Sequence, residues 1–347
     1  MPALKSCRSL IRKLSTRVRS RLHVVYVIIM KALLAESRRY ISRLNRAAQR
    51  FWLKLEQAEV VRLASSGIER PDLIFGRFGN DLWLWANTAG YREHQALRNI
   101  LPAMPDEMTQ ARFTGLTGDA TMIRAFDSYA LINRLGEKYQ RKISSFQCIL
   151  DFGCGWGRMV RLFLRDLDPS RIWGVDCLSG IIDVCRQTNK WCNFCVVDPM
   201  PPTTFPDRMF DLIYSYSVFS HLSEDAHKKW LLEFNRILKP GGLLIVTTFG
   251  RQFIEYCNTL RRLSGDPAER LATVFPDTEQ SLLDFDNGTY CHGPLGGGDI
   301  LDSSFFGETC IPKAYVLKHW TTQFAFLEYI EGQDLLSQNT IVMKRFD

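Results

Sequence analysis

Short apolar runs alternate with amphipathic runs between residues 146 and 249. Apolar runs bounded by turn residues predict buried strands, and apolar positions with helical spacing predict helices. Strands are expected at 146–152, 171–176, 193–198, 210–217 and 242–249, with helices at 158–167, 179–188 and 225–238. The Pro–Gly sequence Lys239-Pro-Gly-Gly242 is expected to end the last of these helices before the fifth strand. Strands that alternate with helices in this way predict a mostly parallel sheet covered on both faces.

The chain on both sides of this run predicts further segments. Residues 1–63 show helical apolar spacing with arginines on the opposite face, so we expect a basic amphipathic helical arm. Residues 64–145 combine an aromatic-rich stretch with a helical run from Met122 to Tyr139, which predicts a helical and aromatic cap. The remainder, 146–347, is expected to be one domain with late strands at 324–330 and 340–346 and an insertion at 250–312. Loops as long as this insertion are usually functional lids or disordered segments.

Positive charge is concentrated in the arm. The chain carries a formal net charge of +7, yet residues 1–50 hold 13 lysines and arginines against one acid, Glu36, so the body is acidic. Such an arm fits solvated helices that pack on the body or on a second copy of the chain. It also fits an anionic membrane surface or an acidic partner. It lacks the alternating aromatic and basic residues typical of nucleic-acid binding, which argues against a nucleic-acid partner.

The apolar stretch from Leu22 to Ala35 is interrupted by Lys31. It is shorter than the roughly 20 apolar residues of a spanning helix. The arm has only some features of a secretory signal or a mitochondrial transit peptide. The ten cysteines are scattered without a regular framework, as expected in a reducing compartment. We therefore expect a cytoplasmic protein, with peripheral membrane contact left open.

A glycine-rich loop follows the first predicted strand, in the sequence Asp151-Phe-Gly-Cys-Gly-Trp-Gly157. In open parallel sheets, ligands bind beyond the carboxyl ends of the strands, where glycines let the backbone approach the ligand. A dinucleotide loop would have glycine where Arg158 stands, and an acid so close to the loop would repel phosphates. The loop instead suits a ligand with an ammonium group and no phosphate, such as S-adenosylmethionine.

Acidic residues end the next two strands. Asp176 is placed to accept hydrogen bonds from both hydroxyls of a ribose, although an aspartate there could also cap the following helix. Asp198 is placed near an adenine amino group, with a simple turn before Pro199 as the alternative. The segment from Pro199 to Pro206 is too rich in proline for a full helix.

Together these motifs resemble the class I S-adenosylmethionine-dependent methyltransferases over about residues 146–249. The resemblance rests on the acidic glycine loop, the acidic end of strand two, Phe210-Asp-Leu-Ile213 and Leu238-Lys-Pro-Gly-Gly242. It implies a Rossmann-like sheet of seven strands whose last strand is antiparallel. It also implies S-adenosyl-L-methionine as cofactor. The residues expected to contact that cofactor are Asp151, Phe152, Gly153, Cys154, Gly155, Gly157, Asp176, Cys177, Asp198 and Ser215. The cap and the Cys-Gly-Trp-Gly-Arg variant of the loop are similar to bacterial methyltransferases found with glycan- and lipid-modifying enzymes.

Methyl transfer to a hydroxyl oxygen also requires a base that removes its proton. His221 follows the fourth strand and is the candidate base, with packing against the next helix as the alternative. Tyr216 and, in the insertion, Tyr290 and His292 are candidate substrate contacts. We expect O-methylation of a small molecule, a sugar or glycan, or a lipid-linked acceptor. N-methylation of a macromolecule and a non-catalytic cofactor-binding scaffold remain alternatives.

Metal chemistry is not expected. Cys192-x-x-Cys195 has no second pair and no spaced histidines to complete a zinc site, and the carboxylate cluster of the catechol-type enzymes is missing. An Asn/Asp-Pro-Pro-Tyr/Phe motif typical of enzymes that methylate amino groups is also missing after strand four, where the chain reads Ser215-Tyr-Ser-Val218.

Overall fold

The computed structural model describes residues 52–261, 270–332 and 338–347. The chain divides into two compact units, Met1–Glu59 and Val60–Asp347. The arm predicted for residues 1–63 therefore lies mostly outside the described residues, and only its end, which is helical from residue 52, is seen. Among the described residues, no helix is both long enough and apolar enough to cross a lipid bilayer. The larger unit contains the predicted sheet.

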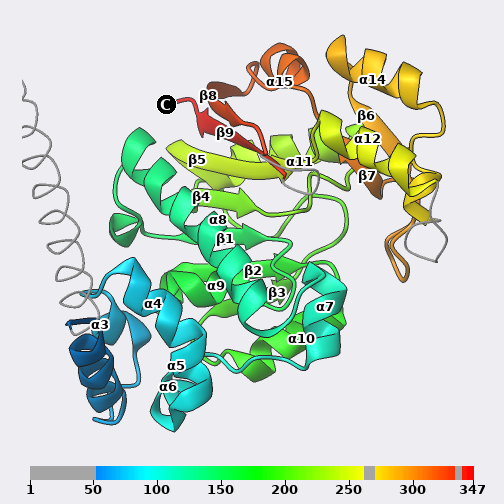
Figure 1. Ribbon diagram of the computed structural model, residues 1–347. Coiled ribbons are helices and arrows are strands. Elements are labelled where there is room, and N and C mark those ends of the chain that lie inside the picture. The colour runs from blue at the N-terminus through cyan, green and yellow to red at the C-terminus, as the bar shows by residue number, and fades with distance from the viewer. Residues whose placement is uncertain (1–51, 262–269, 333–337) are drawn as a thin grey trace, which may run out of the picture. The chain divides into compact units, whose positions relative to one another are not determined.

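Seven strands form one sheet in the order β3-β2-β1-β4-β5-β9-β8 (Figure 1). Strands β1 to β5 run parallel, and β9 is antiparallel to both of its neighbours, β5 and β8. This confirms the predicted seven-stranded sheet with an antiparallel last strand. The strand bounds are Ile149–Phe152 (β1), Ile172–Asp176 (β2), Asn193–Val196 (β3), Phe210–Ser215 (β4), Leu238–Thr248 (β5), Phe324–Ile330 (β8) and Asn339–Arg345 (β9).

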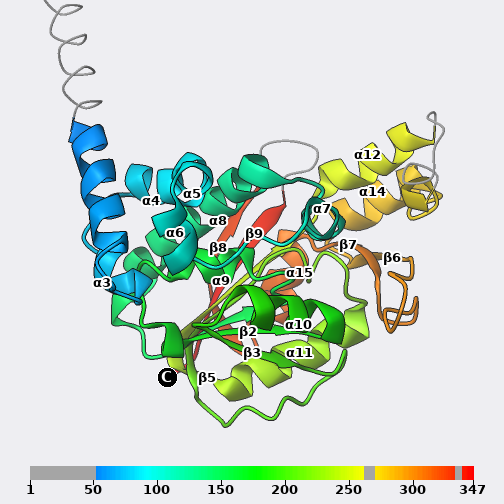
Figure 2. The ribbon, with the colours of Figure 1, turned by 90° about the horizontal axis from the view of Figure 1, so that it is seen from below.

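Helices cover both faces of this sheet (Figure 2). The first face packs against α8 (Gly118–Tyr139), α9 (Arg158–Phe163) and α10 (Ser179–Thr188), and the second against α11 (Glu224–Ile237) and α15 (Lys313–His319). Trp230 and Phe234 project from α11 at helical spacing into the core on the second face, where Trp320 joins them. Strand order reverses between β1 and β4, so the loops after these strands flank the site where ligands of such sheets bind.

The region before α8 folds as a group of short helices. They are α3 (Pro71–Phe75), α4 (Asn80–Asn87), α5 (Ala89–Glu93), α6 (Gln95–Ile100) and α7 (Glu107–Thr114), with the 3-10 turns η1 (Ile143–Ser145) and η2 (Pro169–Arg171) further along the chain. Arg161 of α9 is buried and fastens this group to the sheet domain. It donates to Asn87 Oδ1 at 2.7 Å and to the carbonyl of Pro102, and it lies over the ring of Tyr91. The cap therefore packs directly on the helix that follows the glycine loop.

The insertion is a folded subdomain rather than an extended loop. It contains α12 (Arg251–Leu260), α14 (Thr278–Asp286) and a hairpin of β6 (Cys291–Pro294) and β7 (Gly307–Cys310). Phe253, Val274 and Cys310 belong to a separate small apolar core inside it. A segment of this length becomes ordered because that core, built from positions distant in the chain, offsets the entropy of ordering it.

The fifth strand begins at Leu238, earlier than the predicted Gly242. Leu238 pairs with Phe210, and the register shifts before the regular pairing of Leu212 with Leu243. Gly241 takes a φ of 71° within this irregular stretch. The Pro–Gly signal therefore ends the helix, at Ile237, and also forms an irregular start of the strand.

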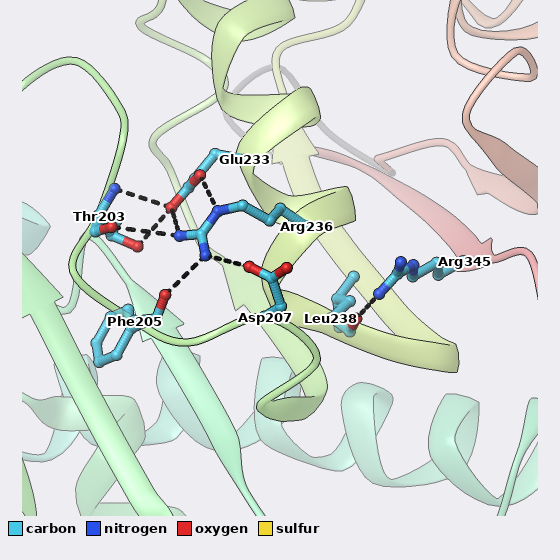
Figure 3. Close-up of polar contacts among 7 residues, drawn as sticks. All are labelled: Thr203, Phe205, Asp207, Glu233, Arg236, Leu238 and Arg345. Atoms are coloured by element: carbon cyan, nitrogen blue, oxygen red, sulfur yellow. Dashed lines mark hydrogen bonds and ion pairs between the residues drawn. The ribbon is translucent and has the colours of Figure 1, made fainter.

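The proline-rich segment between β3 and β4 contains no helix, as predicted. Its backbone is held by Arg236 of α11, which donates to the carbonyls of Phe205 (2.8 Å) and Thr203 (3.2 Å) (Figure 3). Arg236 also forms an ion pair with Glu233, and Glu233 Oε1 accepts from the backbone N–H of Thr203 at 2.8 Å. Side chains from one turn of α11 thus replace the hydrogen bonds that a helix would have made.

Candidate active site

The glycine loop connects β1 to α9 with a backbone that only glycine adopts easily. Gly153, Gly155 and Gly157 all have positive φ, at 74°, 50° and 81°. The N–H groups of Gly153 and Cys154 both donate to the carbonyl of Val175 at 2.9 Å, which fastens the loop to β2. A Cβ on Gly153 would lie 2.2 Å from Val218 Cγ2, so the close approach of the loop after β4 also requires glycine.

Asp176 ends β2 and organises the same loop. Its Oδ2 accepts from the N–H of Gly155 at 3.0 Å, and its Oδ1 accepts from the N–H of Leu178 at 3.1 Å. Burial raises the pKa of this carboxyl, and these backbone hydrogen bonds act in the opposite direction. Asp176 therefore holds the turn before α10 and the glycine loop, but its side chain does not cap α10, as the alternative had it.

A cavity of about 530 Å³ opens beside this loop. Most of the residues predicted for the cofactor and acceptor line it, namely Asp151, Phe152, Gly153, Cys154, Gly155, Asp176, Cys177, Asp198, Tyr216 and His221. The fold thus brings together residues at or just after the ends of β1, β2 and β3 and residues of the loop after β4. Four predicted residues, Gly157, Ser215, Tyr290 and His292, do not line it.

Gly157 and Ser215 occupy structural positions next to the cavity. Gly157 is buried and is the residue that precedes α9, so its positive φ lets the chain enter that helix. Ser215 is the last residue of β4, and its Oγ is buried without a hydrogen-bond partner among the described residues. It lines a second cavity, next to α8, together with its neighbours Tyr214 and Tyr216.

Neither Tyr290 nor His292 lines the cavity. Tyr290 packs in the core of the sheet domain, where its ring stacks on that of His227 of α11. The hydroxyl of Tyr290 donates to the carbonyl of Leu222 at 2.8 Å, and the side chain is buried. Thr309 Oγ1 donates to the same carbonyl at 2.7 Å and lies 2.8 Å from His292 Nδ1. Tyr290 thus bonds directly to the loop that carries His221, and His292 supports that loop through Thr309 of β7, the strand that pairs with it.

A cation and a carboxylate lie buried together in the cavity wall. Burial raises the pKa of Asp151 to about 7, although the charge of Arg158 acts to lower it. Asp151 Oδ2 has no hydrogen-bond partner among the described residues. Arg158 is 8% exposed, lies over the ring of Tyr216 at 5.1 Å, and contacts Thr121 Oγ1 at 3.4 Å. Within the described part of the chain it forms no ion pair at salt-bridge distance, so both groups can interact with a ligand.

His221 is held on the cavity wall by residues of the insertion. Its Nδ1 lies 2.9 Å from the carbonyl oxygen of Gly307 and 3.3 Å from Glu308 Oε2. The imidazole stacks on Phe306, with ring centroids 5.1 Å apart and planes inclined by 12°. Burial acts to lower the pKa of His221, but the charge and hydrogen bond of Glu308 outweigh it, so the pKa is raised.

The cavity also contains residues that no sequence motif indicated. Phe113 of α7 lies against the glycine loop, where a Cβ on Gly155 would meet its ring at 3.3 Å. Phe305, Phe306 and Glu308 reach the cavity from the insertion. Their positions depend on packing between segments far apart in the chain, so neither spacing nor periodicity could have identified them.

The second cavity, of about 700 Å³, lies between α8 and the ends of β4, β5 and β8. Tyr216 lines both cavities. Apolar residues, among them Ile123, Leu131 and Ile245, form much of its wall, and Thr247 and Gln338 add polar groups. Among the described residues, no group of three or more His, Cys, Asp and Glu side chains is arranged to hold a metal ion.

The residues of the first cavity fit S-adenosylmethionine. Asp151, Asp176 and Asp198 place carboxylates where a cationic ligand with hydroxyl and amino groups would be stabilised. Arg158 provides a buried cation for the carboxylate of the amino-acid tail. Gly153 and Gly155 have positive φ values and close neighbours, so a side chain is disfavoured at both positions. The loop backbone there is therefore not covered by side chains of its own. Nothing in this wall requires a phosphate.

Residues 149–242 match the family described as Methyltransferase domain. The chain is 27% identical over 142 residues to "Phosphoethanolamine N-methyltransferase 1" of Zea mays, covering 40% of this chain and 25% of that protein. It is 29% identical over 153 residues to "Malonyl-[acyl-carrier protein] O-methyltransferase 2" of Ilyobacter polytropus, covering 41% and 57%. A solved S-adenosylmethionine-dependent methyltransferase from Methanosarcina mazei aligns at a TM-score of 0.42 and 18% identity, covering 61% of this chain and 97% of that one.

The match, together with the sheet order and the loop, defines the class of domain. Residues 149–242 are a methyltransferase domain of the class I superfamily, for which S-adenosylmethionine is the methyl donor. The chain spans between a quarter and about three fifths of the length of the first relatives that it matches. These relatives carry names of N- and O-methyltransferases, so the acceptor is not shared among them.

Proposed function

We propose that the whole protein is an S-adenosylmethionine-dependent O-methyltransferase whose acceptor is a hydroxyl of a small molecule, a sugar or glycan, or a lipid-linked molecule. The observation that carries the proposal is the shared cavity, which puts His221 in the same wall as the glycine loop and Asp176. When bound, the cofactor supplies an electrophilic methyl group on a good leaving group. The protein then has to align the acceptor and remove its proton.

The roles of the protein's own residues follow from their places in the cavity. Asp176 and Asp198 would bind the ribose and adenine, and Arg158 the carboxylate of the amino-acid tail. Tyr216 separates this cavity from the second one, so an acceptor held there would reach the methyl group past Tyr216. The mixed apolar and polar wall of the second cavity suits the part of the acceptor that does not react.

Titration calorimetry with S-adenosylmethionine and S-adenosylhomocysteine tests the cofactor part of this proposal. We expect both to bind the full chain, and Asp176→Ala to weaken both. Asp183→Ala is the matched control, because this α10 aspartate is exposed and, among the residues that the structure describes, pairs with Arg186 alone. Absence of binding by the unaltered protein would overturn the proposal at its first step.

A screen for S-adenosylhomocysteine release tests the acceptor part. The probes are free monosaccharides, alkyl glycosides, polyprenyl phosphate sugars and, as the competing class, primary amines and transfer RNA. We expect release with a hydroxyl acceptor and a methyl ether in the product. Methylation confined to nitrogen would contradict O-methylation and favour the N-methyltransferase alternative, which the name of the Zea mays relative supports.

A further inference from the structure

We propose that Glu308 of the insertion is a positioning residue that makes His221 the general base, and that the acceptor atom is therefore a neutral hydroxyl oxygen. This inference rests on the proposed function and adds to it the chemistry of the reacting group. It also assigns a role in the reaction to the insertion, which lies outside the methyltransferase domain of residues 149–242.

The hydrogen bond from Nδ1 decides the tautomer of His221. The partner of Nδ1 at 2.9 Å is the carbonyl oxygen of Gly307, which can only accept, so Nδ1 carries the proton. In the neutral ring the lone pair is then on Nε2. Nε2 has no hydrogen-bond partner among the described residues, and the ring lines the cavity. The free lone pair therefore belongs to the nitrogen that is available to a ligand.

The backbone fixes this arrangement from both sides. The N–H of Gly307 donates to the carbonyl of His221 at 2.8 Å, and the N–H of Thr309 donates to the carbonyl of Ser220 at 2.7 Å. Leu222 forms an isolated antiparallel bridge with Phe306. The segment Ser220 to Leu222 thus pairs with the chain from Phe306 to Thr309, so the backbone of Glu308 cannot shift relative to that of His221 without breaking these hydrogen bonds.

Glu308 stabilises the charge that His221 gains when it takes a proton. Its side chain is 11% exposed, and Oε2 lies 3.3 Å from Nδ1 and has no hydrogen-bond donor of its own among the described residues. An opposite charge at this distance, in a site shielded from water, favours the imidazolium form. The other groups that face the ring are the aromatic rings of Phe306 and Phe249, and His292 from β6 acts on it electrostatically.

The chemistry of the step requires a base of this kind only for some acceptors. The acceptor oxygen forms a bond to the methyl carbon while the carbon–sulfur bond breaks and its electron pair stays on sulfur. The hydroxyl proton passes to Nε2, so the positive charge lost at sulfur appears on the imidazolium beside Glu308. A carboxylate acceptor has no proton to lose at neutral pH and would gain nothing from this pair. The geometry therefore favours an acceptor that must lose a proton, which the hydroxyl of the proposed function is and a carboxylate is not.

Nuclear magnetic resonance of the full chain, with ¹⁵N-labelled histidine, tests the pair without any acceptor. The ring signals of His221 are assigned by their loss in His221→Gln. In the unaltered protein we expect a neutral ring protonated at Nδ1. In Glu308→Gln we expect the same tautomer and a pKa at least about one unit lower. Glu279→Gln, an exposed glutamate of α14 in the same insertion, should leave the titration unchanged.

Two results would overturn the inference. One is a neutral ring protonated at Nε2 in the unaltered protein, a measurement that does not depend on any variant folding correctly. The other is an unchanged His221 pKa in folded Glu308→Gln. With a hydroxyl acceptor from the screen, Glu308→Gln should also shift the pH profile of kcat to lower pH and leave cofactor affinity unchanged. Failure of cofactor binding would instead count against the proposed function, because the titration needs no cofactor.

Discussion

Asp176 Oδ2 accepts a hydrogen bond from the backbone N–H of Gly155 at 3.0 Å, which joins the end of β2 to the glycine loop. The second oxygen of the same carboxylate accepts from Leu178, at the start of α10. One side chain therefore sets the spacing between the two segments that would bind a ribose and an amino-acid tail. These segments follow the neighbouring strands β1 and β2, and β1 borders the switch in strand order.

Replacing Asp176 should weaken cofactor binding with little effect on the fold. Asp176→Ala removes hydrogen bonds made by a charged group, which are worth about 1–3 kcal/mol. Calorimetric affinity for S-adenosylmethionine should fall accordingly, by about 5- to 150-fold. Asp183→Ala serves as the control on the neighbouring helix. Equal affinities for the two variants would show that Asp176 only holds the backbone of Gly155 and Leu178 and does not contact the cofactor.

Gly153→Ala should disturb the loop because of a single contact. The added Cβ would lie 2.2 Å from Val218 Cγ2, and the φ of 74° is unfavourable for alanine. Overpacking of this kind costs about 1–3 kcal/mol of unfolding free energy, which urea titration measures.

The double variant Gly153→Ala, Val218→Ala should recover part of that loss, since the clashing methyl group is gone. Gly180→Ala is the control, because a Cβ at this α10 position meets no atom within 4 Å. A helical alanine there should be neutral or slightly stabilising. If Gly153→Ala is as stable as Gly180→Ala, the loop does not have the packing described.

Cofactor affinity should depend on pH through Asp151. Burial raises the pKa of this carboxyl from its ordinary 3.8 to about 7, so it is largely protonated at pH 6 in the free protein. A cationic ligand favours the ionised form and must displace the proton. Affinity should therefore rise about tenfold per pH unit below pH 7 and level off above it. Calorimetry at pH 5.5 to 8.5 measures this slope.

Asp151→Asn removes the titrating group, so its affinity should be nearly independent of pH over the same range. The free energy of unfolding provides a second check, because this carboxyl makes it fall with rising pH whereas the affinity rises. The folded protein binds more protons than the unfolded chain between about pH 4 and pH 7, so this carboxyl lowers stability as pH rises through that window. A flat affinity profile for the unaltered protein would contradict the role of Asp151.

Asp211 should contribute to stability and not to catalysis. Its carboxylate is 3% exposed, forms ion pairs with Arg141 and Lys239, and accepts from the backbone N–H of Gln147 and Cys148. Asp211→Ala leaves these donors without their acceptor. Arg141 and Lys239 are 44% and 30% exposed and can be solvated, so the cost comes mainly from the backbone donors. We expect a loss of about 1–3 kcal/mol in unfolding free energy.

The matched control for Asp211 is Asp225→Ala, which breaks an exposed ion pair with Lys229 on α11. Surface pairs contribute less than about 1 kcal/mol. Thermal or urea unfolding of both variants separates the two cases. A similar small loss for both would mean that the buried network around β4 is not as costly to disrupt as its burial indicates.

The basic arm should affect binding to surfaces but not to the cofactor. Residues 1–50 carry 13 lysines and arginines and one acid, and each basic residue near an anionic membrane is worth about 1 kcal/mol. Removing residues 1–51 should abolish sedimentation of the protein with vesicles that contain phosphatidylserine. Its sedimentation with vesicles of pure phosphatidylcholine should not change. Calorimetric affinity for S-adenosylmethionine should stay the same. Loss of that affinity would place the arm within the cofactor-binding fold.

The sheet and the cofactor loop were predictable because their signals are local. Apolar runs located β1 to β4, and helical spacing located α10 at its observed bounds, Ser179–Thr188. The start of β5 was predicted late, because the Pro–Gly sequence is part of the strand and its pairing begins with Phe210. The glycine spacing and Asp176 predicted the cofactor loop, since the residues that shape a βα turn are close together in the chain.

What the sequence could not determine is the side of the cavity formed by the insertion. Tyr290 and His292 have the residue types of substrate contacts, yet only the pairing of β7 with the loop after β4 shows that they hold that loop. The same pairing places Glu308, 87 positions after His221, within 3.3 Å of its ring. Periodicity reports which face of one element is buried. It does not report which distant element covers that face, because this depends on packing and charge pairing across the whole fold.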